Sequence, residues 1–160
     1  MNLEIDLKKM VDSIAKVIPG FNGYYKKETR REEDRNLRER IANRLKKIED
    51  SIYAYGRRVA KKGDMAALER LNSLTKRIEK LNDTIRYSNY GYTGFFDLNS
   101  VSEDILKKII KKDFELIEWF NEIPQHIENE KDVDDISSEI EKGFGIFEER
   151  LKILKNILEG

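Results

Sequence analysis

A long apolar stripe with helical spacing is the feature that most constrains what this chain can fold into. Large apolar side chains recur in steps of three and four residues, at Leu37, Ile41, Leu45, Ile48, Ile52, Tyr55 and Val59. This alternation is a heptad seam, which is typical of helices that pack against a partner along their whole length. The stripe predicts one long helix over about residues 24–62.

The residues that follow predict where this helix ends and where a second one begins. Gly63 favours the left-handed backbone of a helix end, and Asp64 is a good N-cap for the following helix. A second stripe with the same spacing then predicts a helix over about residues 65–87. Because the turn between the two helices is short, we expect a long, coiled-coil-like antiparallel hairpin.

Apolar stripes also predict a helix on each side of this hairpin. The first covers about residues 3–18 and is stopped by the Pro19-Gly20 pair. The other starts at a capping box, Ser100–Glu103, and is expected to end or kink at Pro124.

A last helix is expected to start at Asp132, which is a good N-cap residue. Gly143 and Gly145 lie inside its stripe, and the stripe keeps its phase across them, which predicts one helix with a close-packed or bent point. Together these elements predict an all-α, up-and-down bundle of four to five helices that forms a single domain, residues 1–160.

The composition excludes several functional classes. Lys and Arg number 31, as do Asp and Glu, so the net charge is zero and nucleic-acid binding is not expected. The absence of Cys excludes disulfides and thiolate metal sites. No apolar run has the length of a membrane span and the N-terminus is acidic, so we expect a cytoplasmic protein without a transmembrane segment. Abundant Lys and Glu without Cys resemble the composition of thermophile proteins.

Two short stretches, residues 18–25 and 90–97, place glycines beside aromatic residues between the helical patterns. Glycine allows a turn that other residues resist, and aromatic side chains commonly pin such a turn to a core. We therefore expect specific structure at both stretches, with turns at Gly20, Gly23, Gly91 and Gly94.

Charged residues replace leucine where the long stripe is projected toward the N-terminus. The next seam positions are Asp34, Arg30 and Lys27, and the first two lie four residues apart, so they can pair on one helix face. Helix lengths bring the second glycine–aromatic stretch beside them, so one interpretation is a candidate binding site formed by Tyr24, Arg30, Asp34 and Tyr92. Two alternatives remain open: a salt bridge that fixes the helix register, and a helix end that projects into solvent.

The other candidate groups do not indicate catalysis. Basic clusters within 57–62 and 107–112 offer contacts to phosphates, but acidic residues lie close to both. His126 is the only histidine and is expected in a loop, whereas a di-iron bundle needs paired Glu-x-x-His motifs. The chain contains no Walker A, Rossmann or G-x-S-x-G pattern. We expect no catalytic residue, no metal and no cofactor.

Two regions of the chain resemble a group of uncharacterised prokaryotic helical proteins. The resemblance is carried by Ile18-Pro19-Gly20-Phe21-x-Gly23-Tyr24, by Lys27-Glu28-x-Arg30-Arg31-Glu32-x-Asp34-Arg35-x-Leu37-Arg38, and by Gly91-Tyr92-x-Gly94-Phe95-Phe96-Asp97. It implies an association with membrane-scaffold proteins of the band 7 type, and it implies no activity.

The long seams favour a non-catalytic protein that binds other proteins or acts as a scaffold. The alternative is a bundle that binds a small ligand or polyphosphate at Arg30 and Asp34. A third hypothesis is a peripheral membrane adaptor that uses the amphipathic helix over 3–18. We also expect a homo-oligomer, because the 24–62 helix is longer than its partner in the hairpin.

Overall fold

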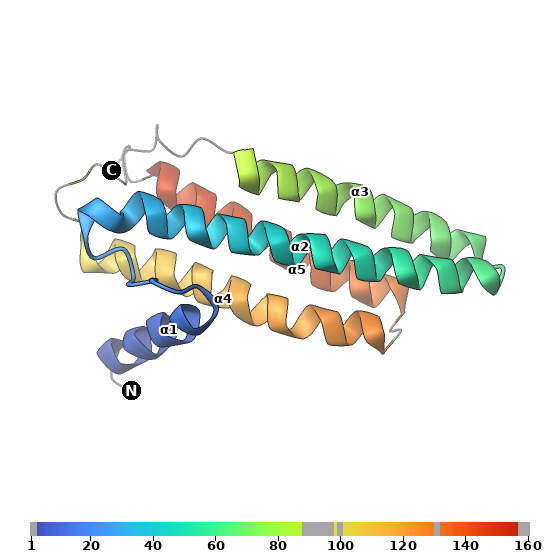
Figure 1. The fold of residues 1–160 in the computed structure, drawn as a ribbon, viewed down its shortest axis with the longest axis horizontal. Coiled ribbons are helices and arrows are strands. Elements are labelled where there is room, and N and C mark those ends of the chain that lie inside the picture. The colour runs from blue at the N-terminus through green and yellow to red at the C-terminus, as the bar shows by residue number, and fades with distance from the viewer. Residues whose placement is uncertain (1–2, 88–97, 99–100, 130–131, 157–160) are drawn as a thin grey trace. The chain divides into compact units, whose positions relative to one another are not determined.

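The described part of the chain is an all-α helical bundle (Figure 1). The computed structural model describes residues 3–87, 98, 101–129 and 132–156, and these residues contain no strand. The elements are α1 (Leu3–Val17), a short 3-10 helix η1 (Lys27–Thr29), α2 (Arg30–Lys61), α3 (Met65–Tyr87), α4 (Glu103–Glu128) and α5 (Val133–Asn156). The predicted fold class is therefore confirmed.

The chain packs as two compact units, which we call the first and the second unit. The first consists of Met1–Arg38, Asn89–Glu118 and Gly145–Gly160, and the second of Glu39–Ser88 and Trp119–Phe144. Helices α2, α4 and α5 each contribute residues to both units.

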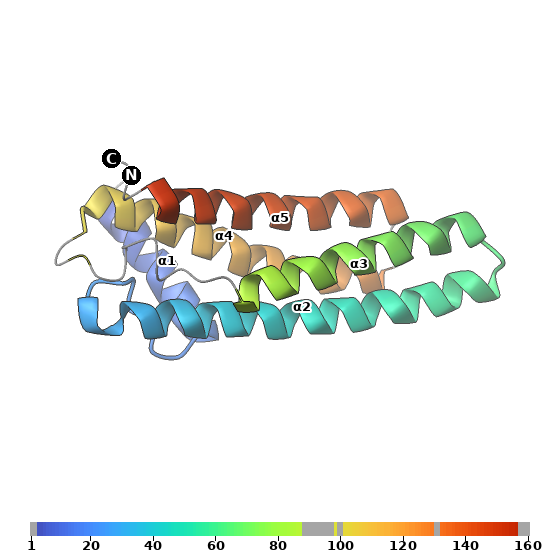
Figure 2. The ribbon, with the colours of Figure 1, turned by 90° about the horizontal axis from the view of Figure 1, so that it is seen from above.

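The predicted hairpin forms in the second unit, where α2 and α3 lie side by side (Figures 1 and 2). Gly63 has φ +79°, the left-handed conformation that ends α2. The Asp64 carboxylate then accepts a hydrogen bond from the Ala67 N–H at 3.1 Å and caps α3. Both apolar stripes are buried except at Leu68, which is half-buried. The Asn82 side chain donates to the Ala42 carbonyl at 3.2 Å and joins the two helices.

The start of α2 differs from the prediction, because the helix begins at Arg30 and not near residue 24. Gly23 and Tyr24 have φ +72° and +64°, which no right-handed helix contains. The Glu33 carboxylate accepts hydrogen bonds from the N–H groups of Asn22, at 2.5 Å, and Tyr24, at 3.3 Å. A side chain one turn into the helix thus satisfies the donors of a turn that the apolar periodicity did not reveal.

Of the two predicted effects of Pro124, an end or a kink, the end is wrong, because α4 continues to Glu128. Proline removes one backbone donor, and the flanking Ile123 and Ile127 are both buried, so packing offsets the loss. His126 consequently lies in the helix and not in a loop. At the other end of α4, Ser102 caps the helix by accepting the Ile105 N–H at 3.3 Å.

Helix α5 is continuous across both glycines, as predicted, and the reason lies at Gly143. Asp132 caps the helix by accepting the Asp134 N–H at 2.8 Å. A Cβ atom at Gly143 would lie 2.4 Å from the Trp119 indole, so this position is close-packed. The indole is itself fixed, since its N–H donates to the Glu139 carbonyl at 2.6 Å.

This contact gives the two glycines opposite responses to alanine. We expect Gly143→Ala to lower the free energy of unfolding by about 1–3 kcal/mol, because the methyl group overpacks against Trp119. Gly145→Ala meets nothing within 4 Å and should raise it by about 0.5–1 kcal/mol through helix propensity. Urea unfolding of both variants measures the difference, and equal effects would contradict the close packing at Gly143.

Candidate functional site

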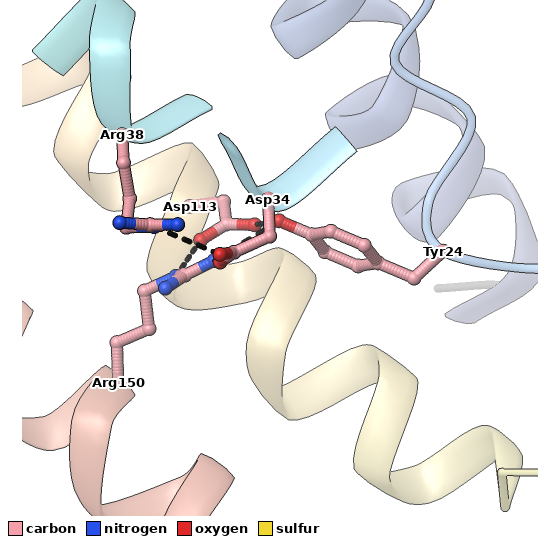
Figure 3. A network of polar contacts seen from close by, with 5 residues as sticks. All are labelled: Tyr24, Asp34, Arg38, Asp113 and Arg150. Atoms are coloured by element: carbon pink, nitrogen blue, oxygen red, sulfur yellow. Dashed lines mark hydrogen bonds and ion pairs between the residues drawn. The ribbon is translucent and has the colours of Figure 1, made fainter. Parts of the chain in front are cut away.

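A network of buried polar side chains occupies the first unit where apolar residues would be expected (Figure 3). The Arg150 guanidinium donates to Asp113 Oδ1 through Nε at 2.6 Å and to Asp34 Oδ1 through Nη2 at 2.7 Å. The Tyr24 hydroxyl donates to Asp113 Oδ2 at 2.5 Å and accepts from Arg150 Nη2 at 3.1 Å. Arg38 completes the network by donating from Nε to Asp34 Oδ2 at 2.8 Å.

The network joins side chains that are far apart in the sequence. Asp34 comes from α2, Asp113 from α4 and Arg150 from α5, while Tyr24 comes from the turn that precedes η1. All four are essentially inaccessible, with at most 1% of their surface exposed. Taking charges out of water costs several kcal/mol for each ion, so the paired geometry is required for this arrangement to be stable.

Burial shifts the pKa values of two groups within the network, Tyr24 and Asp113. Burial raises the pKa of the Tyr24 hydroxyl well above its ordinary value of 10.0, and the neighbouring Asp113 raises it further. Burial also raises the pKa of the Asp113 carboxyl, whereas the charge of Arg150 and the hydrogen bonds from Tyr24 and Arg150 lower it. Tyr24 is therefore a neutral donor at neutral pH, and the Arg150 guanidinium favours the charged form of Asp113 against the effect of burial.

Arg30 holds the backbone that leads into α2. Its Nε donates to the Tyr24 carbonyl at 2.8 Å, and its Nη1 donates to the Leu98 carbonyl at 2.7 Å. Arg30 and Asp34 are 2% and 1% exposed, so the helix end does not project into solvent. Both oxygens of Asp34 accept from other arginines, Arg150 and Arg38, and the polar atoms of the junction bind groups of the protein itself.

The other predicted site residues divide between the described and the undescribed parts of the chain. Gly20 and Gly23 have φ +88° and +72°, and the ring of Tyr25 packs against Gly23. Tyr92 and the turns at Gly91 and Gly94 lie outside the described residues.

Sequence reasoning missed Asp113 and Arg150, the two residues that complete the network. Both interrupt buried stripes at helical spacing, Asp113 between Ile109 and Leu116, and Arg150 between Phe147 and Leu154. The projection that located Asp34 on α2 would have found them on α4 and α5. The apolar pattern alone favours a stripe on α4 through Ile105 and Phe114, which are only partly buried, and this shift of one residue conceals Asp113.

His126 lines a separate hollow in the second unit, of about 390 Å³, with Asp132, Asp135, Ser138 and Glu139. The His126 Nδ1 atom is buried and has no hydrogen-bond partner among the described residues. Across the part of the chain that the structure describes, no three His, Cys, Asp or Glu residues gather closely enough to hold a metal. The hollow is therefore a polar surface feature that does not indicate a metal centre.

One basic residue of the predicted phosphate-contacting cluster on α4 is likewise engaged with acidic side chains. Lys112 forms ion pairs with Glu115, at 3.3 Å, and with Glu149. These contacts raise the pKa of Lys112, and the contact with Lys112 lowers the pKa of Glu149. Lys112 therefore faces carboxylates of its own unit, which compete with any phosphate for its charge.

Comparison of the chain with protein-family models, curated proteins and solved structures finds no match. Among the described helices, none combines the length and the apolar character needed to cross a membrane.

Removing the central cation should destabilise the first unit strongly. We expect Arg150→Met to lower the free energy of unfolding by about 3–5 kcal/mol, because it leaves Asp34 and Asp113 buried without their shared partner. Combining it with Asp34→Leu, Asp113→Leu and Tyr24→Phe should recover most of the loss. Arg70→Met, which breaks an exposed pair with Asp134, is the control and should cost under about 1 kcal/mol. Additive losses in the combined variant, measured by urea unfolding, would contradict a coupled network.

The raised pKa of Tyr24 predicts a specific dependence of stability on pH. In the folded protein the Tyr24 hydroxyl keeps its proton at a pH at which the same hydroxyl in the unfolded chain begins to lose it. The contribution of Tyr24 to the free energy of unfolding is therefore complete below about pH 10 and declines above it. Tyr24→Phe should lower the free energy of unfolding by about 1–3 kcal/mol near pH 7. The difference in free energy of unfolding between this variant and the wild type should narrow above about pH 10. Urea unfolding between neutral and alkaline pH measures this, with Tyr25→Phe as the exposed control. A difference that stays constant with pH would refute the assignment.

Proposed function

We propose that this protein is a non-catalytic helical scaffold that binds other proteins through its surface. The proposal is supported above all by the tyrosines that the fold leaves outside its cores. Tyr25, Tyr53 and Tyr87 are 50%, 43% and 78% exposed, and together with Met65 they are the large apolar side chains exposed on the described surface. Tyrosine is enriched at protein interfaces because it offers a large apolar area and a hydrogen-bonding group at little entropic cost.

The buried network supports this role indirectly. Arg30, Asp34 and Tyr24 hydrogen bond to groups of the protein itself, so a ligand at this junction would have to displace existing contacts. The network fits a device that fixes helix register and thereby holds surface side chains in place. The small-ligand or polyphosphate hypothesis predicts instead that polyphosphate binds the wild type and that Arg30→Met abolishes binding. We expect isothermal titration calorimetry with polyphosphate to show no binding.

The membrane-adaptor hypothesis requires an apolar face on α1 that is free to meet lipid. Half of the described apolar residues of that face pack into the first unit, where Leu7, Ile14 and Ile18 are 7%, 0% and 2% exposed, while Met10, Val11 and Val17 are half-buried. An association with a membrane scaffold of the band 7 type is therefore better served by protein contacts than by insertion of α1 into lipid.

Affinity capture from the native cell, followed by mass spectrometry, tests the scaffold proposal. We expect the wild type to enrich a defined set of proteins, and Tyr25→Ser/Tyr87→Ser to reduce their recovery about tenfold. Lys9→Ser/Lys76→Ser changes two exposed residues of a type that interfaces contain less often, and should retain the set. Circular dichroism confirms that both variants remain folded. The proposal would be contradicted if the wild type and both variants recovered the same proteins equally, or if the wild type enriched no protein.

A further inference from the structure

A second stripe runs along the outer side of α2, distinct from its buried seam. Lys46, Asp50, Tyr53, Arg57 and Ala60 follow one another in steps of four and three residues, the spacing that aligns side chains on a helix. All five are exposed, whereas the buried seam of the same helix passes through Ile48, Ile52, Tyr55 and Val59. The outer stripe therefore has the periodicity of a helix-packing surface, and its residues remain exposed although the Tyr53 hydroxyl contacts Glu79 of α3.

A hollow of about 180 Å³ accompanies this stripe between α2 and α3. Tyr53 and Arg57 line its α2 side with Gly56 and Ala60, and Leu68 and Asn72 are among the residues on its α3 side. Gly56 adds no side chain to the hollow, and a Cβ at this position would lie at an ordinary contact distance, 3.4 Å, from Leu68. The Tyr53 hydroxyl donates to Glu79 of α3 at 3.4 Å, so the ring is held at the edge of the hollow.

The order of charges along the stripe is self-complementary in one orientation only. Asp50 lies three residues before Tyr53, and Arg57 lies four residues after it. If two copies cross antiparallel at Tyr53, Asp50 of each copy lies within one residue of the level of Arg57 of the other, and Lys46 lies level with Ala60. A parallel pairing would instead place Lys46, Asp50 and Arg57 each against its own copy, and like charges in contact are unfavourable.

We propose that the outer face of α2 is an isologous docking surface for a second copy of this chain, crossing antiparallel at Tyr53. A two-fold interface requires a patch that complements itself, which this stripe does through its central aromatic residue and flanking opposite charges. Tyr53 of each copy packs at the hollow beside Gly56 of the other. A partner of a different sequence would have to present the same charges in reverse order along its helix. A second copy of this chain that crosses antiparallel presents them in that order.

The inference rests on the proposed scaffold role and names a second copy of this chain as one partner. A contact of a few helical turns buries less surface than a standard interface, so we expect a dissociation constant in the micromolar range. Because the charge pairs lie at the surface, rising salt concentration should weaken the dimer.

Charge reversal tests the orientation directly. Sedimentation equilibrium should show a dimer for the wild type and a monomer for both Asp50→Lys and Arg57→Asp, since each change sets like charges against each other. An equimolar mixture of these two variants should dimerise again. In the mixed dimer the introduced lysine faces the introduced aspartate, and the unchanged Arg57 of one copy faces the unchanged Asp50 of the other. Arg40→Asp, an exposed reversal on the same helix outside the stripe, is the control and should dimerise like the wild type.

Three results would overturn the inference: a monomeric wild type, single variants that dimerise as the wild type does, or a mixture that stays monomeric. Circular dichroism on each variant separates loss of pairing from loss of fold. A monomeric wild type that still captures proteins through Tyr25 and Tyr87 would remove this inference and leave the proposed scaffold role standing. A monomeric wild type that also captures no protein would remove both the docking surface and the scaffold role.

Discussion

The first unit depends on the buried ion pairs of the Arg150 guanidinium. This guanidinium lies between two carboxylates, Asp34 on α2 and Asp113 on α4, and all three side chains are excluded from water. A buried charge tolerates few geometries, because any displacement that lengthens a hydrogen bond exposes the full desolvation cost. The helices that carry these residues are therefore held at one register and rotation, whereas purely apolar side chains would accept several.

The turn before α2 is tied to the same network. Tyr24 reaches Asp113 with its hydroxyl, while its backbone N–H is held by Glu33 and its carbonyl by Arg30. These three contacts hold a residue other than glycine at φ +64°, a conformation that costs free energy and persists only where the surroundings impose it. The first glycine–aromatic stretch, residues 18–25, thus supports the buried charges. Phe21 adds an edge-to-face contact with the Tyr24 ring.

The second unit is stabilised differently. Its α2–α3 hairpin is held by two apolar seams, with small polar side chains such as Thr75 and Asn82 bonded to helix carbonyls. Its exposed ion pairs, such as Arg70 with Asp134, contribute little free energy. The features of this unit that suggest function are instead on its surface, where Tyr53 and the neighbouring charges follow helical spacing without being buried.

The sequence alone determined where the helices lie, because apolar periodicity and caps are local signals. The bounds of α3 agree with the approximate prediction, and Gly63, Asp64 and Asp132 ended or began helices as expected. Periodicity also located Arg30 and Asp34 on the buried side of α2. Only the tertiary structure decided their partners, since Arg150 lies 116 residues from Asp34 and hydrogen-bond geometry depends on helix rotation. It also decided where α2 begins and that α4 passes Pro124, because burial and side-chain hydrogen bonds there outweigh local backbone preference.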